Sequence, residues 1–316
     1  MKFLPVLLTV FLAIAGGLRA QSATNAPVFS NGSTAAQAEF MRIEKVDGKR
    51  KFQMVIATYE LGKFPGRKVA LIAAVHIASP EYYALLQKRF KKYDAVLMEG
   101  IDGKEKFGKK GALLFPPSLE VFAQSATPAK KASSPEKLSN VHDIQETMSR
   151  AMGFEHQLRS VDYRQPNFVY PDMSMKELQK RLGDKGVDYL MPEEQLIEPL
   201  LPMAQSLLGG GARRAEASPM QNIFRNLMAE LILRMDFEKA LAGDDPAQVK
   251  RRDYFNIILK ERNEKVIEAL RAKLDEGARS VGVFYGAMHL PDIARTLRED
   301  FGARKISEEW ITAWDL

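Results

Sequence analysis

The chain of 316 residues contains no cysteine and only four histidines. Disulfide bonds therefore contribute nothing to its stability, and any metal site must use histidine and carboxylate ligands alone. A lipid anchor on an N-terminal cysteine is excluded for the same reason. At this length the chain can bury one large hydrophobic core or two modest ones.

A long apolar segment is also lacking. The apolar run Phe3–Ile14 is short for a bilayer span, which needs about 20 residues. Lys2 gives a positive start and Ala20 ends the segment with a small residue, so residues 1–20 are typical of a cleaved signal peptide. We therefore expect export to the periplasm or the cell exterior and no integral membrane segment after cleavage. A single uncleaved membrane anchor is the competing interpretation.

The charge balance has no strong excess of one sign. The chain carries 46 basic and 40 acidic residues, and loss of Lys2 and Arg19 with the signal peptide leaves a net charge of +4. Small basic clusters at residues 104–110 and 250–252 lack the regular aromatic interleaving of nucleic-acid surfaces. We interpret them as solvated faces and expect no nucleic-acid partner.

Two similar stretches stand at opposite ends of the chain. Residues 68–76 (KVALIAAVH) and 280–289 (SVGVFYGAMH) are short apolar runs that end in His76 and His289. Such a run, bounded by charge, predicts a buried strand. A proline follows each histidine within four residues, where it suits the first turn of a helix.

The segments that follow also match. Residues 81–92 and 292–300 have the apolar spacing of amphipathic helices, and residues 94–99 and 304–314 read as strands. The sequence thus predicts an α/β fold with a mixed sheet built from two related strand–His–helix–strand halves. Right-handed crossovers would make the strands of each unit parallel and place the histidines at their carboxyl ends, where open sheets bind ligands.

The remaining segments predict the domain organisation. Residues 40–46 and 52–60 predict a β-hairpin through the Asp47-Gly48 turn. We expect residues 21–36 to be a flexible leader and 37–316 a single domain, in which a helical insertion (141–245) separates the halves 37–123 and 246–316. Within the insertion, residues 157–163 predict a strand. The Gly-, Ser-, Pro- and Lys-rich stretches 124–140 and 209–219 are expected to be exposed loops beside a helical cover over the site.

His76, Glu99 and His289 are the main candidates for chemistry. A single histidine at a strand end is usually structural, but two at matched positions of a repeat favour one shared site. Glu99 closes the strand 94–99, which would bring it to the same sheet edge. Two imidazoles and one carboxylate suit a divalent transition metal with open coordination positions. The same three groups could instead act as metal-free acid and base.

Four further polar residues are secondary candidates. Arg262 and Asn263 lie within the predicted helix 246–274. They could be polar residues of the helix surface. Alternatively, the guanidinium of Arg262 could bind a carboxylate, either that of Glu99 or one on a substrate. Asp162 and Asp172 are the remaining acidic candidates. For Asp172 the cap of a helix is the commoner explanation.

Together these motifs resemble the TraB/GumN family, also called Tiki-like or pheromone-shutdown proteins. The resemblance lies in AAVH ending at His76, LMEG containing Glu99, ERNE containing Arg262 and Asn263, and GAMH ending at His289. The family has two GxxH motifs around a variable helical middle, an acidic residue after the first unit, and an Arg-Asn or Arg-Asp pair before the second. The resemblance covers residues 40–123 and 245–316 well and the middle loosely.

One position departs from that pattern, because Ala73 stands where the family has glycine. A methyl group would interfere if the backbone there took a positive φ or let a ligand approach closely.

The resemblance implies a fold shared with erythromycin-esterase-like and haem-binding ChaN-like proteins. Through the animal Tiki members it also implies a protease that depends on manganese or cobalt. We therefore expect an exported metal-dependent hydrolase, a peptidase, with His76, Glu99 and His289 as metal ligands and a peptide or small molecule as its substrate. Arg262 would orient Glu99 or bind a substrate carboxylate, with Asn263 assisting. The alternatives are a metal-free, esterase-like His/Glu hydrolase and a non-enzymatic protein that sequesters peptide or haem.

Overall fold

The computed structural model describes residues 39–101, 145–182, 200–208, 217–234 and 246–316. The predicted signal peptide and leader, the loop 124–140 and most of the loop 209–219 lie outside these residues. In the described part of the chain, no helix is both long and apolar enough to cross a membrane.

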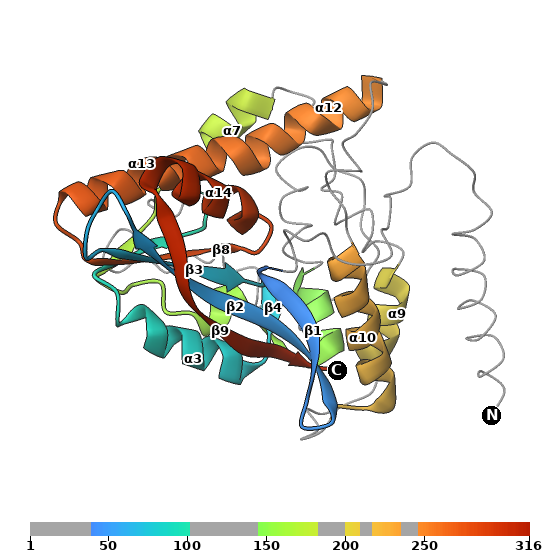
Figure 1. The fold of residues 1–316 in the computed structure, drawn as a ribbon. Coiled ribbons are helices and arrows are strands. Elements are labelled where there is room, and N and C mark those ends of the chain that lie inside the picture. Colours follow the sequence, from blue (N-terminus) through green and yellow to red (C-terminus); the bar gives the residue numbers. More distant parts are fainter. Residues whose placement is uncertain (1–38, 102–144, 183–199, 209–216, 235–245) are drawn as a thin grey trace, which may run out of the picture.

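Seven strands form one mixed sheet, which confirms the predicted α/β class (Figure 1). The order across the sheet is β1-β2-β3-β8-β5-β7, with β9 paired to β2. The neighbours β3, β8, β5 and β7 run parallel, whereas β1, β3 and β9 are antiparallel to β2. The strands are β1 (Met41–Val46), β2 (Lys49–Leu61), β3 (Lys68–Ala74), β5 (Ala95–Met98), β7 (Phe168–Val169), β8 (Ser280–Gly286) and β9 (Ala303–Asp315).

The predicted hairpin is confirmed as β1 and β2. Val46 pairs with Lys49, so the turn has two residues, and both Asp47 (φ 51°) and Gly48 (φ 79°) adopt the positive φ that a type I′ turn requires. β2 continues well beyond β1. It pairs with β9 along one edge, and its other edge is shared by β1 and then β3.

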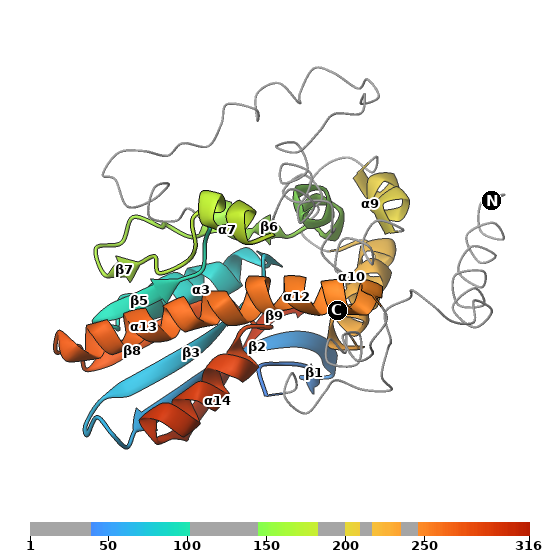
Figure 2. The ribbon, with the colours of Figure 1, turned by 90° about the horizontal axis from the view of Figure 1, so that it is seen from above.

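Helices cover both faces of the sheet, giving three layers. α3 (Pro80–Phe90) lies on one face, and α13 (Arg262–Asp275) and α14 (Leu290–Phe301) lie on the other (Figures 1 and 2). α3 begins where the Ser79 hydroxyl accepts a hydrogen bond from the Tyr82 N–H (3.2 Å). Other helices are α6 (Gln157–Ser160), α7 (Met175–Leu182), α9 (Leu201–Leu208), α10 (Pro219–Arg234) and α12 (Pro246–Phe255), and residues 145–152 are also helical.

The chain leaves β3 and β8 in opposite directions across the sheet. These strands are neighbours with Ala74 opposite Gly286. From β3 the chain passes through α3 to β5, whereas from β8 it passes through α14, on the other face, to β9. Each connection joins strands of the same direction, as predicted. The carboxyl ends of β3 and β8 therefore form a topological switch point, where open α/β sheets bind ligands.

The predicted strand 157–163 is wrong. A two-stranded sheet pairs β4 (Ile77–Ala78) with β6 (Glu155–His156), and the chain then turns at once into α6. The turn begins there because His156 Nδ1 accepts a hydrogen bond from the Leu158 N–H (3.2 Å). The middle of the chain contributes a strand elsewhere, since β7 pairs in parallel with β5 at the end of the main sheet. The insertion therefore contributes a strand to the main sheet as well as helices.

Candidate functional site

Four polar residues follow the carboxyl ends of four adjacent parallel strands. His76 follows β3, His289 follows β8, Glu99 follows β5 and Asp172 follows β7. Because these strands are neighbours in the order β3-β8-β5-β7, all four residues lie at one edge of the sheet. The edge includes the switch point between β3 and β8.

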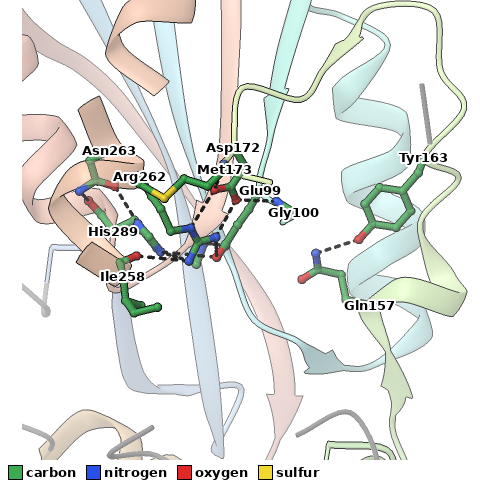
Figure 3. A network of polar contacts seen from close by, with 11 residues as sticks. Glu99, Gly100, Gln157, Tyr163, Asp172, Met173, Ile258, Arg262, Asn263 and His289 are labelled. Carbon is green, nitrogen blue, oxygen red and sulfur yellow. Dashed lines mark hydrogen bonds and ion pairs between the residues drawn. The ribbon is translucent and has the colours of Figure 1, made fainter. Parts of the chain in front are cut away.

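Arg262, at the start of α13, binds both carboxylates of this edge (Figure 3). Its Nε and Nη2 donate to the two oxygens of Asp172 at 2.8 and 2.7 Å, and Nη2 also donates to Glu99 Oε1 at 2.9 Å. The side chain of Arg262 is 7% exposed and that of Asp172 is fully buried. We call Arg262, Glu99, Asp172 and His289 the polar cluster. A buried guanidinium shared by two carboxylates is a strong, directional pair.

The buried face of α13 explains why a charged residue of this helix points inward. Its buried residues recur at helical spacing: Arg262, Asn263, Val266, Ile267, Leu270 and Leu274. Arg262 and Asn263 therefore continue the apolar stripe toward the helix start. A π-helical segment, Asn256–Glu261, immediately precedes them, and Arg262 Nη1 donates to the Ile258 carbonyl within it (3.3 Å). Such π segments occur frequently at functional sites. This stripe can be read in the sequence, and it is a signal that distinguishes an inward Arg262 from surface polarity.

Asp172 does not cap a helix, so that interpretation is wrong. The Ser174 hydroxyl takes this role for α7 by accepting from the Glu177 N–H at 3.1 Å. Asp172 instead accepts from the N–H groups of Gly100 (2.9 Å) and Met173 (2.8 Å), in addition to Arg262. The other acidic candidate, Asp162, is exposed and hydrogen-bonds its own turn outside the site.

Glu99 is held on both oxygens. Oε1 accepts from Arg262 and lies 3.4 Å from His289 Nε2, and Oε2 accepts from the Gly286 N–H at 2.6 Å. A Cβ atom at position 286 would lie 3.2 Å from that Oε2. Glycine therefore stands here because the carboxylate approaches the backbone closely, and not because φ is positive.

Ala73, where the family pattern has glycine, causes no conflict. It lies within β3 opposite Tyr285, and its carbonyl accepts from the Tyr82 hydroxyl. Asp47 is the one residue other than glycine with positive φ in the described chain, so Ala73 has ordinary strand backbone.

The electrostatics of the cluster keep Glu99 ionised. Burial alone would raise the pKa of Glu99, but His289, Arg262 and His76 outweigh this effect and hold that pKa well below its usual range. Burial would likewise lower the pKa of Arg262, but the hydrogen bonds and charges of Asp172 and Glu99 raise it. The cluster therefore contains an ionised Glu99 beside a permanent cation.

The two histidines differ in their surroundings. His76 is exposed, and its carbonyl accepts from the Gln157 N–H at 2.8 Å. His289 is 4% exposed, with Nδ1 2.7 Å from Asn263 Oδ1 and Nε2 3.5 Å from Arg262 Nη1. His289 therefore belongs to the buried cluster, whereas His76 meets solvent beside it.

The predicted metal set His76, Glu99 and His289 is not arranged as one. Among the described residues, no group of three or more His, Asp or Glu side chains is placed to hold a metal ion. The physical reason is that the guanidinium of Arg262 already lies 2.9 Å from Glu99 Oε1, and this positive charge repels a second cation there. These residues consequently do not fit a resident manganese or cobalt ion.

A second polar pair, Gln157 and Tyr163, was not predicted (Figure 3). Gln157 Nε2 donates to the Tyr163 hydroxyl at 2.9 Å, and both residues are buried. Burial, together with the charge of Glu99, raises the pKa of Tyr163, so this pair lies within electrostatic reach of the cluster. The pair could not be predicted from the sequence because residues 157–163 were interpreted as a strand.

We compared the chain with models of protein families, with curated proteins and with solved structures, and found no match in any of the three comparisons.

Replacing Arg262 by methionine tests the energetic role of the cluster. We expect R262M to lose about 3–5 kcal/mol of unfolding free energy, because two buried carboxylates lose their counter-ion. Urea unfolding followed by circular dichroism measures the difference. The control is R234M, since Arg234 pairs with Glu230 on the surface and should lose no more than about 1 kcal/mol. Equal losses in the two variants would contradict the assignment.

The low pKa of Glu99 also predicts a pH dependence. Because this pKa is lower in the folded protein than in the unfolded chain, ionised Glu99 stabilises the fold above the unfolded pKa of about 4.3. That gain is lost as the pH falls through the folded pKa. In urea unfolding from pH 7 to pH 2.5, the stability difference between wild type and E99Q should therefore be largest near neutrality and shrink below about pH 4. E268Q, on the exposed face of α13, should show no such trend. A difference that stays constant with pH would contradict the prediction.

Proposed function

We propose that this protein is an exported hydrolase, related to the TraB/GumN family, that works without a bound metal. His76 is its acid–base group, Glu99 is the fixed charge beside it, and peptides or small esters are its substrate class. The proposed relation to the TraB/GumN family rests on the sequence motifs, and the proposed export rests on the signal-peptide pattern of residues 1–20.

The observation that carries the proposal is the juxtaposition of His76 and Glu99 at the switch point. The imidazole of His76 is exposed, so water and substrate can reach it. Its charge is near enough to contribute to the low pKa of Glu99. The interaction is mutual, because an ionised carboxylate stabilises the imidazolium that a general base becomes after taking a proton.

The reaction needs a single water molecule. The water oxygen attacks the substrate carbonyl carbon while His76 takes one of its protons. The bond from that carbon to the leaving nitrogen or oxygen then breaks, and the imidazolium returns the proton to the leaving group. His76 ends neutral, as it began. Glu99 stays ionised throughout, because Arg262 and the Gly286 N–H hold its two oxygens.

The metal-free alternative is favoured over the metal-dependent one by what surrounds Glu99. A carboxylate that binds a metal must offer an oxygen lone pair to it. Here the guanidinium of Arg262 supplies the positive charge in that position, at 2.9 Å from Oε1. His289 Nε2 faces the same guanidinium.

The test measures turnover and metal dependence together. The mature exported protein is assayed with quenched fluorogenic peptides and with p-nitrophenyl esters, in EDTA or with added manganese, cobalt or zinc. We expect turnover that EDTA does not change and that H76Q lowers by about 10²–10⁴-fold. Because His76 is exposed, H76Q should change stability by no more than about 0.5 kcal/mol. The control K92Q, an exposed position after α3, should keep full activity.

Two results would overturn the proposal. Activity that EDTA abolishes and manganese or cobalt restores would favour the metal-dependent hydrolase expected from the family resemblance. Absence of turnover with every substrate, combined with tight binding of peptide or haem, would favour a sequestering protein.

A further inference from the structure

The side-chain amide of Asn263 faces His289 (Figure 3) and, on its other side, contacts the acidic residue Asp292. Its Nδ2 lies 2.9 Å from Asp292 Oδ2 and 3.3 Å from the His289 carbonyl oxygen. Its Oδ1 lies 2.7 Å from His289 Nδ1. The amide therefore contacts two oxygens with one end and a ring nitrogen with the other.

The chemistry of these partners fixes the orientation of the amide. A carboxylate and a backbone carbonyl can only accept hydrogen bonds. The end of Asn263 that faces them must therefore be the NH₂ group, since a reversed amide would place its oxygen against both. The amide oxygen must then face His289 Nδ1.

That orientation decides where His289 carries its proton. An amide oxygen has no hydrogen to donate, so the hydrogen of the 2.7 Å contact belongs to Nδ1. In the neutral ring Nε2 then carries no hydrogen, and its lone pair can accept a hydrogen bond from Arg262 Nη1 at 3.5 Å. When His289 is protonated, Nε2–H can instead donate to Glu99 Oε1 at 3.4 Å. Protons enter and leave this imidazole only on the side that faces the cluster.

We infer that Asp292 is a positioning residue of the site, which acts through Asn263 to hold His289 as the Nδ1–H tautomer. Asp292 stands in the first turn of α14 and is itself held by Arg295 through its other oxygen. The tautomer follows from the hydrogen bonds alone. The consequence for catalysis rests on the proposed function: Nε2 of His289 accepts from Arg262 in the neutral ring and donates to Glu99 in the protonated ring, and so maintains the charge arrangement that His76 meets.

The tautomer can be read directly by NMR of the ¹⁵N-labelled full chain. Protonated and unprotonated imidazole nitrogens have well-separated ¹⁵N shifts, and the chain has only four histidines. H289Q identifies the signals of His289. Spectra are recorded at alkaline pH, where imidazoles are ordinarily neutral.

We expect wild type to carry the proton on Nδ1. D292A should show a mixture of both tautomers, because the amide of Asn263 keeps only the longer contact to the His289 carbonyl. D292N retains an oxygen acceptor and should restore the wild-type spectrum. D300A, an exposed carboxylate of the same helix that pairs with Arg271, should leave the spectrum unchanged. In hydrolysis, D292A should lower kcat about tenfold with KM unchanged, and D292N should recover most of it.

The outcomes separate this inference from the proposed function. A proton on Nε2 in wild type, or an unchanged spectrum in D292A, would overturn the inference even if the protein hydrolyses its substrates. A tautomer that responds as described in a protein without turnover would support the positioning role and count against the hydrolase.

Discussion

The guanidinium of Arg262 is the group on which the arrangement of the site depends. It joins the start of α13 to residues that follow β5 and β7, because Glu99 and Asp172 share its donors. Burying three charges costs solvation energy that their attraction recovers only with good geometry and further hydrogen bonds. Those bonds come from the N–H groups of Gly100, Met173 and Gly286. The backbone N–H groups at the strand ends thus help to stabilise the buried charges.

This arrangement changes what the acidic residues can do. Two carboxylates that faced an empty pocket could bind a cation from solution. In this site the protein itself supplies the cation, the guanidinium of Arg262. Together with His289, the fixed charge of Arg262 holds the pKa of Glu99 well below its usual range. The imidazole of His76 is exposed beside this buried arrangement and contributes to the low pKa of Glu99.

The sequence predicted the parts of the molecule that follow local periodicity. The matched runs ending at His76 and His289 became the neighbouring strands β3 and β8, and the Asp47-Gly48 turn formed its hairpin. Local pattern failed in the middle of the chain. The side chain of His156 starts a helical turn where alternation indicated a strand. β7 has two residues, too few for any periodicity to reveal.

The same limit applies to the site. The repeat in the sequence indicated that the strands are parallel and end at one edge of the sheet. The grouping of His76, His289 and Glu99 at that edge could therefore be predicted. Whether Arg262 would face Glu99, a substrate or solvent depended on packing that a sequence does not show. The role of Asp172 also depended on β7 joining the sheet, and the repeat contains no counterpart of that strand.

The position of β8 has a consequence for how the protein is made. β8 pairs with β3 on one side and β5 on the other, so these two strands of the first half do not touch each other directly. A nascent chain that ends before β8 lacks the strand that joins them and also lacks His289. Folding must therefore wait for pairings between distant parts of the sequence, which are slow to form. A chain that ends before β8 therefore cannot assemble the site, which forms only late in synthesis.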